Sequence, residues 1–237
     1  SLTVDEALNL TVTAATAVTP KGAAMRVSAI GVSNPNGDLT LGRDGAANTI
    51  TVKADAGTYT GAETGESWAE ANGFVQYGPI TISGDTTLNV SAQGMAPGAG
   101  STVSLAEAKA IGINGSSTGA VKLGGLTGTI SAQGGTVNTG GMVFADATAG
   151  GIDLRGSLTS DSTDLTVTAT GGTAAAGATN ADVRATASGL VQRNDNKGTG
   201  SDKLTVTGPA TLHVTAIGGG YEGTGSAGKS SAVATGI

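Results

Sequence analysis

The sequence predicts an all-β fold: a parallel β-solenoid of six turns, each with three strands and about 40 residues. A motif of the form Ala-x-Gly-apolar occurs six times, and it begins at Ala29, Ala71, Ala110, Ala149, Ala187 and Ala234. A second motif, apolar-x-apolar-x-Ala, also occurs six times and ends at Ala14, Ala54, Ala92, Ala132, Ala169 and Ala216. Its spacings are 40, 38, 40, 37 and 47 residues. Apolar and polar residues alternate in most copies, as they do in strands with one buried face.

The first strand of each turn is a short apolar segment, 7 to 11 residues before the start of the second motif. These segments span residues 2–4, 39–41, 80–82, 121–123, 158–160 and 204–206. The second strand carries the apolar-x-apolar-x-Ala motif, and the third ends on Ala-x-Gly-apolar. We expect the whole chain to form one domain, with turns at 1–38, 39–79, 80–120, 121–157, 158–203 and 204–237.

The third strand presents alanine to the interior, which indicates that the opposite wall comes close there. Ala108 and Ala185 are expected inside and Thr186 outside. The glycine that follows permits a bend or a close backbone approach. The long fifth interval is attributed to a loop inserted at residues 192–203.

Three strands that recur in a fixed order pair most simply with their own counterparts in the previous turn, which makes the sheets parallel. A β-sandwich would place antiparallel strands every 8 to 12 residues without a three-element period. A propeller blade has a similar length but needs four strands and usually an aromatic-rich signature.

Composition narrows the function. The chain has 41 Gly, no Cys and only 3% aromatic residues, and its net charge of −6 argues against nucleic-acid binding. No apolar run approaches the roughly 20 residues of a membrane helix. An acidic, cysteine-free, Thr/Gly-rich β protein is common among secreted bacterial proteins, so an extracellular or cell-surface location is expected.

On the six repeated motifs, the chain resembles the right-handed parallel β-helix of autotransporter passengers, filamentous-haemagglutinin-like secreted adhesins and phage fibres. The resemblance is architectural. It implies no functional residue, because no family-specific motif accompanies it.

Several short patterns suggest chemistry, and each also has a simpler interpretation. Residues 223–230, GTGSAGKS, match a P-loop, but a P-loop needs a following helix and the seven remaining residues read as a strand. Weak calcium ligands are Asp195, Asn196 and Asp202, within a stretch that is more simply a solvated loop. His213 is the only histidine and reads as an exposed strand residue.

Three carboxylates lie close in sequence near one corner, and a pair of them could serve a polysaccharide-active enzyme: Asp153, Asp161 and Asp164. The same positions in neighbouring turns are Gly, Thr and Ser, so catalysis is not expected, and neither is a cofactor.

Residues at outward positions of the third strand in successive turns could form a lateral contact surface. The outward residues are Trp68, Glu70, Glu107, Lys109 and Arg26, with Ile30 and Ile111 beside them, and the contact residues expected are Trp68, Glu70, Lys109 and Ile111. The simpler interpretation is a solvated face with scattered contacts. The sharper one is a surface that binds a partner or a carbohydrate, with Trp68 as its anchor.

The two ends show no capping helix, charged lid or blocked edge strand, although a bare terminal turn exposes unpaired backbone groups. We therefore expect an assembly interface formed by Leu2, Thr3, Val4, Leu10, Val12, Ala232, Ala234 and Ile237. The predicted function is a subunit of an extracellular filament, a homopolymer that stacks head to tail. The alternatives are an adhesin-type binding module, excerpted from a longer solenoid, that recognises a receptor or a glycan, and, with less support, the enzyme. Besides other copies of the chain, cell-surface glycans or neighbouring filaments are possible partners.

Overall fold

The computed structural model describes residues 2–4, 6–16, 24–34, 37–43, 45–115, 120–193, 203–222 and 228–237. Within these ranges the chain forms 22 strands and no helix, which confirms the all-β prediction. No helix that could span a bilayer occurs in this part of the chain.

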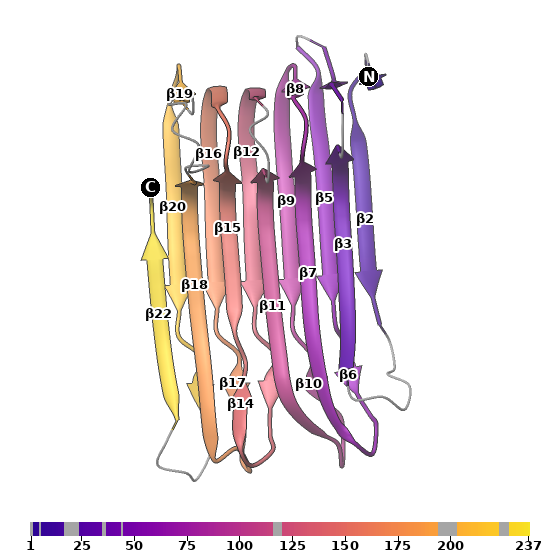
Figure 1. The fold of residues 1–237 in the computed structure, drawn as a ribbon, viewed down its shortest axis with the longest axis vertical. Coiled ribbons are helices and arrows are strands. Elements are labelled where there is room, and N and C mark those ends of the chain that lie inside the picture. The colour runs from indigo at the N-terminus through magenta and orange to yellow at the C-terminus, as the bar shows by residue number, and fades with distance from the viewer. Residues whose placement is uncertain are drawn as a thin grey trace.

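Two long parallel sheets face each other (Figure 1). We call them sheet 1 and sheet 2. Sheet 1 contains β1 (Leu2–Val4), β2 (Asn9–Ala15), β4 (Leu39–Leu41), β5 (Ala47–Asp55), β8 (Ile80–Ile82), β9 (Asp85–Gln93), β12 (Val121–Gln133), β16 (Leu158–Thr170), β19 (Leu204–Val206) and β20 (Ala210–Ile217). Sheet 2 contains β3 (Ala24–Asn34), β7 (Thr64–Gln76), β11 (Thr102–Gly115), β14 (Met142–Phe144), β15 (Ala147–Leu154), β18 (Asn180–Gln192) and β22 (Lys229–Thr235).

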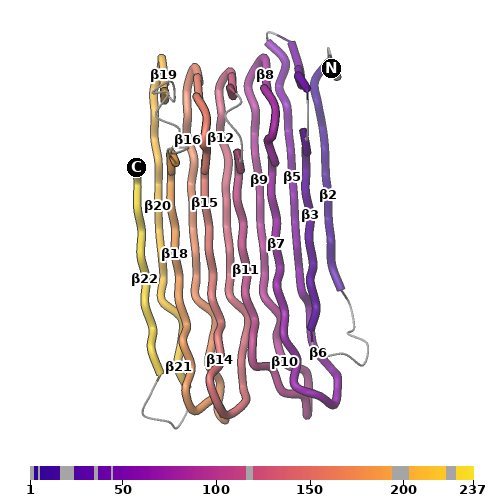
Figure 2. The backbone as a smooth tube through the Cα atoms, viewed as in Figure 1, coloured from indigo at the N-terminus to yellow at the C-terminus, as the bar shows by residue number. Residues whose placement is uncertain are grey.

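The cross-section is a flattened loop. The first and second predicted strands of a turn belong to the same sheet, and in β12 and β16 they join into one continuous strand. The third predicted strand returns in sheet 2, whose arrows in Figure 1 point opposite to those of sheet 1, and Figure 2 traces the same backbone path. The turn therefore has two broad walls.

A short strand at the corner between the walls was not predicted. These strands are β6 (Thr58–Tyr59) with β10 (Ala96–Pro97), and β13 (Thr136–Val137) with β17 (Thr173–Ala174) and β21 (Gly220–Tyr221). Each has only two residues, which is too few to show an alternating pattern.

The pairing register follows the sequence repeat. Ala14 lies opposite Ala54, and the same alignment continues through Ala92, Ala132, Ala169 and Ala216. All pairs between successive passes of the chain are parallel, so the parallel β-solenoid is confirmed.

The prediction of six equivalent turns is refined. Each sheet contains six stacked passes of the chain, but the first and the last are paired on one side only. About four turns of roughly 39 residues lie between neighbours on both sides.

Alanine and glycine in sheet 2 bring the two walls close together. Ala108 and Ala185 are 3% and 1% exposed, as predicted. A Cβ atom built on Gly151 would lie 2.4 Å from the Gly189 carbonyl oxygen and 3.1 Å from Cγ2 of Val167 in sheet 1. The motif glycine is therefore required by the close approach of both the next pass and the opposite wall.

Candidate functional site

Two features of the surface could carry a function: the open edges of the terminal strands and a groove on the outer face of sheet 2. The N- and C-termini lie at opposite ends of the stack (Figure 1). In the described part of the chain, β2 pairs only with β5, and β20 pairs only with β16.

The direction of the backbone hydrogen bonds is the same throughout sheet 1. The Leu8 carbonyl accepts from Thr49 in the next pass, and the Gln133 carbonyl accepts from Gly94 in the previous pass. Since N–H and C=O groups alternate in direction along a strand, inward-facing residues point to the next pass and outward-facing residues to the previous one. The open edge of β2 is thus formed by the backbone groups of Asn9, Thr11 and Thr13.

The open edge of β20 has the complementary set. The Ile217 carbonyl accepts from Gly171 of the previous pass, so the backbone groups of Leu212, Val214 and Ala216 point away from the stack. The side chains also match: residues 10–14 read LTVTA, and residues 212–216 read LHVTA. The short strands β1 and β19 both read LTV.

The predicted assembly residues lie on these terminal passes. Val4, Leu10 and Val12 are half-buried and pack against the core, where they cover it incompletely. At the other end, all of β22 is exposed, including Ala232 and Ala234, and Ile237 is 84% exposed. Thr3 is exposed on β1, which also contains Leu2.

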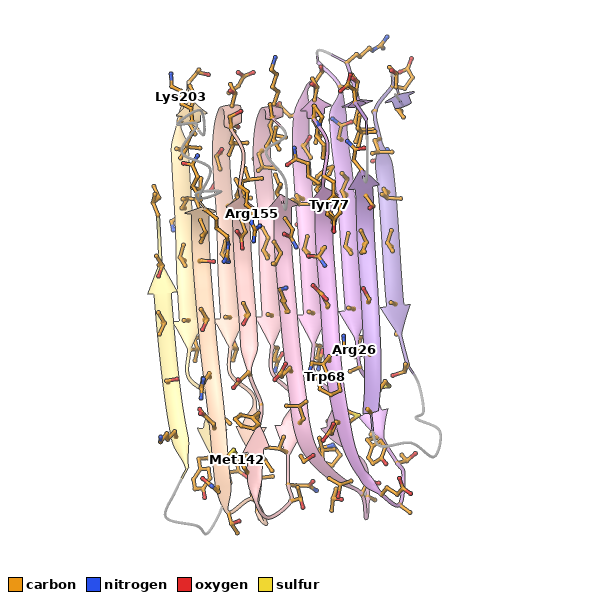
Figure 3. The ribbon with its side chains drawn as sticks, in the orientation of Figure 1. Arg26, Trp68, Tyr77, Met142, Arg155 and Lys203 are labelled. Atoms are coloured by element: carbon orange, nitrogen blue, oxygen red, sulfur yellow. The ribbon has the colours of Figure 1, made fainter. Side chains whose placement is uncertain are left out.

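The groove lies on the outer face of sheet 2, over β3, β7, β11 and the start of β15. Its volume is about 220 Å³. It is lined by Arg26, Trp68, Ala69, Glu70, Glu107, Ala108, Lys109, Asp146 and Thr148, and we call it the Trp68 groove. Figure 3 shows Arg26 and Trp68 side by side.

Side chains at equivalent positions of successive passes lie next to one another across the strands, and we call such a row a column. One column lines this groove. Arg26 lies opposite Trp68, and Trp68 lies opposite Glu107. Asp146 directly precedes the first residue of β15, Ala147, which pairs with Ala108, so Asp146 continues the column. The guanidinium carbon of Arg26 is 5.2 Å from the centroid of the Trp68 ring, a distance typical of a cation–π contact.

The two carboxylates of the column have perturbed acidity. Burial raises the pKa of Glu107, and the negative charge of Asp146 raises it further, while a hydrogen bond from Trp68 acts in the opposite direction. Burial also raises the pKa of Asp146, although the backbone N–H of Arg184 donates to its Oδ1 at 3.1 Å. Neither carboxylate belongs to an ion pair within the described ranges.

The cations around these two carboxylates have other partners. Lys109 Nζ lies 3.3 Å from Oε1 of Glu70, and that oxygen also accepts from Asn72. Arg184 forms an ion pair with Asp182, and its hydrogen bond lowers the pKa of Asp182. No ion pair within the described ranges therefore neutralises Glu107 or Asp146, although the positive charge of Arg184 lowers the pKa of Asp146.

The lateral contact surface predicted from sequence corresponds to this groove in part. Of the residues named for that surface, Arg26, Trp68, Glu70, Glu107 and Lys109 line the groove. Ile111 is only 5% exposed, because its side chain covers the space beside Gly150, so it offers little contact surface.

Asp146 was missed, although the repeat contains the signal that finds it. It stands three residues before Ala149, as Glu107 stands three residues before Ala110. Counting three residues back from the motif alanine of the fourth copy would have placed both carboxylates in one column.

The other sequence candidates do not form a cluster. Asp153 forms a two-pronged ion pair with Arg193, at 2.7 and 2.8 Å, on sheet 2. Asp161 and Asp164 lie on β16 in sheet 1. His213 is exposed on β20. Asp195, Asn196 and Asp202 lie outside the described residues, as does most of the P-loop match.

Among the described residues, no group of three or more His, Cys, Asp or Glu side chains is placed to hold a metal ion. Comparison of the chain with protein-family models, curated protein sequences and solved structures finds no significant match. The fold therefore defines the chain only as a parallel β-solenoid. Its function has to be inferred from the residues on its surface.

Proposed function

We propose that this protein is a structural subunit that stacks end to end into an extracellular or cell-surface filament. The observation that carries the proposal is the complementarity of the two open edges. Backbone groups of β20 that point away from the stack would meet those of β2 in a second copy, in the same pattern that joins successive passes within the chain. This is strand addition at a sheet edge.

The side chains support the same register. Leu10, Val12 and Ala14 of one subunit would continue the columns of Leu212, Val214 and Ala216 of the next, like over like. Since the interface joins two different surfaces of the same molecule and advances along an axis, it would produce an open fibre. Burial of the half-exposed core residues at both ends would supply the driving force.

A proline at Thr11 tests the interface while sparing the subunit. The Thr11 N–H points to the open edge, so proline removes no bond within the chain and blocks pairing with a neighbour. Val4→Lys would place a charge among the apolar side chains of the junction, whereas in a single subunit the lysine reaches solvent. Thr129→Lys, exposed on the central strand β12, is the matched charge control.

Sedimentation velocity should show large assemblies for the wild type and for Thr129→Lys, and monomers with an unchanged melting curve for the other two variants. If wild-type protein stays monomeric at high concentration, self-stacking is refuted. Further turns of a longer solenoid would then be the occupant of these edges.

A second candidate function is a binding module of the adhesin or passenger type, and the Trp68 groove favours it. Exposed aromatic and charged side chains that line a pocket are typical of sites for partners and glycans. An array of Trp68 grooves along a filament would bind repeatedly spaced ligands with high avidity.

A further inference from the structure

We propose that the Trp68 groove binds a sugar residue that carries a free amine, as in a deacetylated hexosamine polymer. The proposal rests on the second candidate function above and specifies its ligand class. It is independent of whether the subunits stack.

Charge selects a cationic ligand. The positive groups that line the groove are already engaged, Arg26 on the Trp68 ring and Lys109 with Glu70. Glu107 on β11 and Asp146, directly before β15, lie on neighbouring passes in one column, and no ion pair within the described ranges neutralises them. An ammonium group between them would relieve the repulsion that raises the pKa of Glu107.

Size and polarity select a sugar ring over a small ion. The groove has a volume of about 220 Å³, more than a single ammonium or metal ion would fill. Trp68 supplies an apolar surface for the C–H face of a ring, and Thr148, Glu70 and Lys109 supply donors and acceptors for its hydroxyl groups.

The stability of the fold gives a second argument. The raised pKa values mean that the ionised forms of Glu107 and Asp146 are disfavoured in the folded protein. Groups that destabilise a fold at neutral pH often serve a function.

Trp68 is the only tryptophan in the chain, so intrinsic fluorescence reports on this groove without a label. The protein is titrated at about pH 6 with glucosamine oligomers and with the same oligomers in N-acetylated form. The free-amine oligomers should change the fluorescence of Trp68 saturably, and the acetylated oligomers should not. Glu107→Gln and Asp146→Asn should each weaken binding about three- to fivefold, in line with the loss of one partly exposed charge.

Asp164→Asn, on the outer face of sheet 1, removes the same charge from the opposite wall and should leave binding unchanged. Equal binding of both oligomers would overturn the role of the amine. Binding of an N-acetyl-lysine amide without binding of either oligomer would assign the groove to a polypeptide. A fluorescence response to calcium chloride alone would also overturn the proposal, as would no response to any of these probes. Sedimentation of the same samples tests the stacking function separately.

Discussion

Ionisation of the Glu107 and Asp146 side chains destabilises the folded chain. Because their pKa values are raised, each stabilises the fold only while protonated, and this contribution is lost as the pH rises above the ordinary value of a carboxyl group. The charged groups around them are Arg26 on β3, Glu70 on β7, Lys109 on β11, and Asp182 and Arg184 on β18, while Lys229 on β22 acts on Asp182.

Glu107→Gln and Asp146→Asn should therefore raise the melting temperature at pH 7 and leave it unchanged at about pH 3. Both side chains are only half-buried, so solvent screening limits the gain to about 0.5 kcal/mol each. Thermal melts at a series of pH values measure this difference. A melting temperature that falls at neutral pH in both variants would mean that the pair stabilises the fold.

The interior alanines of sheet 2 test the register at the same scale. Ala108→Leu or Ala185→Leu would overpack the space between the walls and cost about 1–3 kcal/mol. Leucine at the exposed Thr186 should change stability by less than about 0.5 kcal/mol. Urea denaturation compares the three variants, and similar costs at all three positions would contradict the assigned faces.

For single residues, the sequence predicted the burial of positions that recur in every turn. It did not predict contacts that occur in only one turn. The burial of Ala108 follows from alternation alone. The cover that Ile111 provides could not be predicted in the same way, since it depends on the missing side chain of Gly150 in the next pass.

At the scale of the strand, two adjacent glycines of β15 have different roles. A Cβ at Gly151 would meet a backbone carbonyl at 2.4 Å, whereas a Cβ at Gly150 would meet nothing closer than 3.6 Å. Gly151→Ala should cost about 1–3 kcal/mol because neither the backbone nor Val167 can move away freely. Gly150→Ala should lie within about 0.5 kcal/mol of the wild type. Denaturant unfolding of the pair tests whether the motif glycine is set by close packing; equal stabilities would show that it is not.

The repeated motifs predicted the strands of both walls because each motif spans a full stretch of alternation. They did not predict that the first two strands of a turn share one sheet. Nothing in the residues between Leu123 and Leu126 marks a straight path in preference to a corner. The register in β12 shows it, since Val121 through Gln133 pair continuously with β16 apart from a single residue, Gly124.

At the scale of the molecule, the solenoid forms two walls, and in the described part of the chain their first and last strands are paired on one side only. Its interior is built from repeating columns, and Leu10, Val12 and Ala14 of the first pass occupy the same columns as Leu212, Val214 and Ala216 of the last. Sequence reasoning proposed the residues of an interface between these passes from the repeat and from the absence of caps. The direction of the hydrogen bonds at each edge required the structure.

The central claim is that these edges join copies of the chain into a continuous stack. X-ray fibre diffraction from concentrated, aligned protein tests it most directly. With strands perpendicular to the axis and about 4.8 Å between passes, six passes give a subunit of roughly 29 Å. The account predicts a sharp meridional reflection near 4.8 Å from long filaments that Thr11→Pro does not form. Discrete particles about 29 Å long at every concentration, with no meridional reflection, would contradict it.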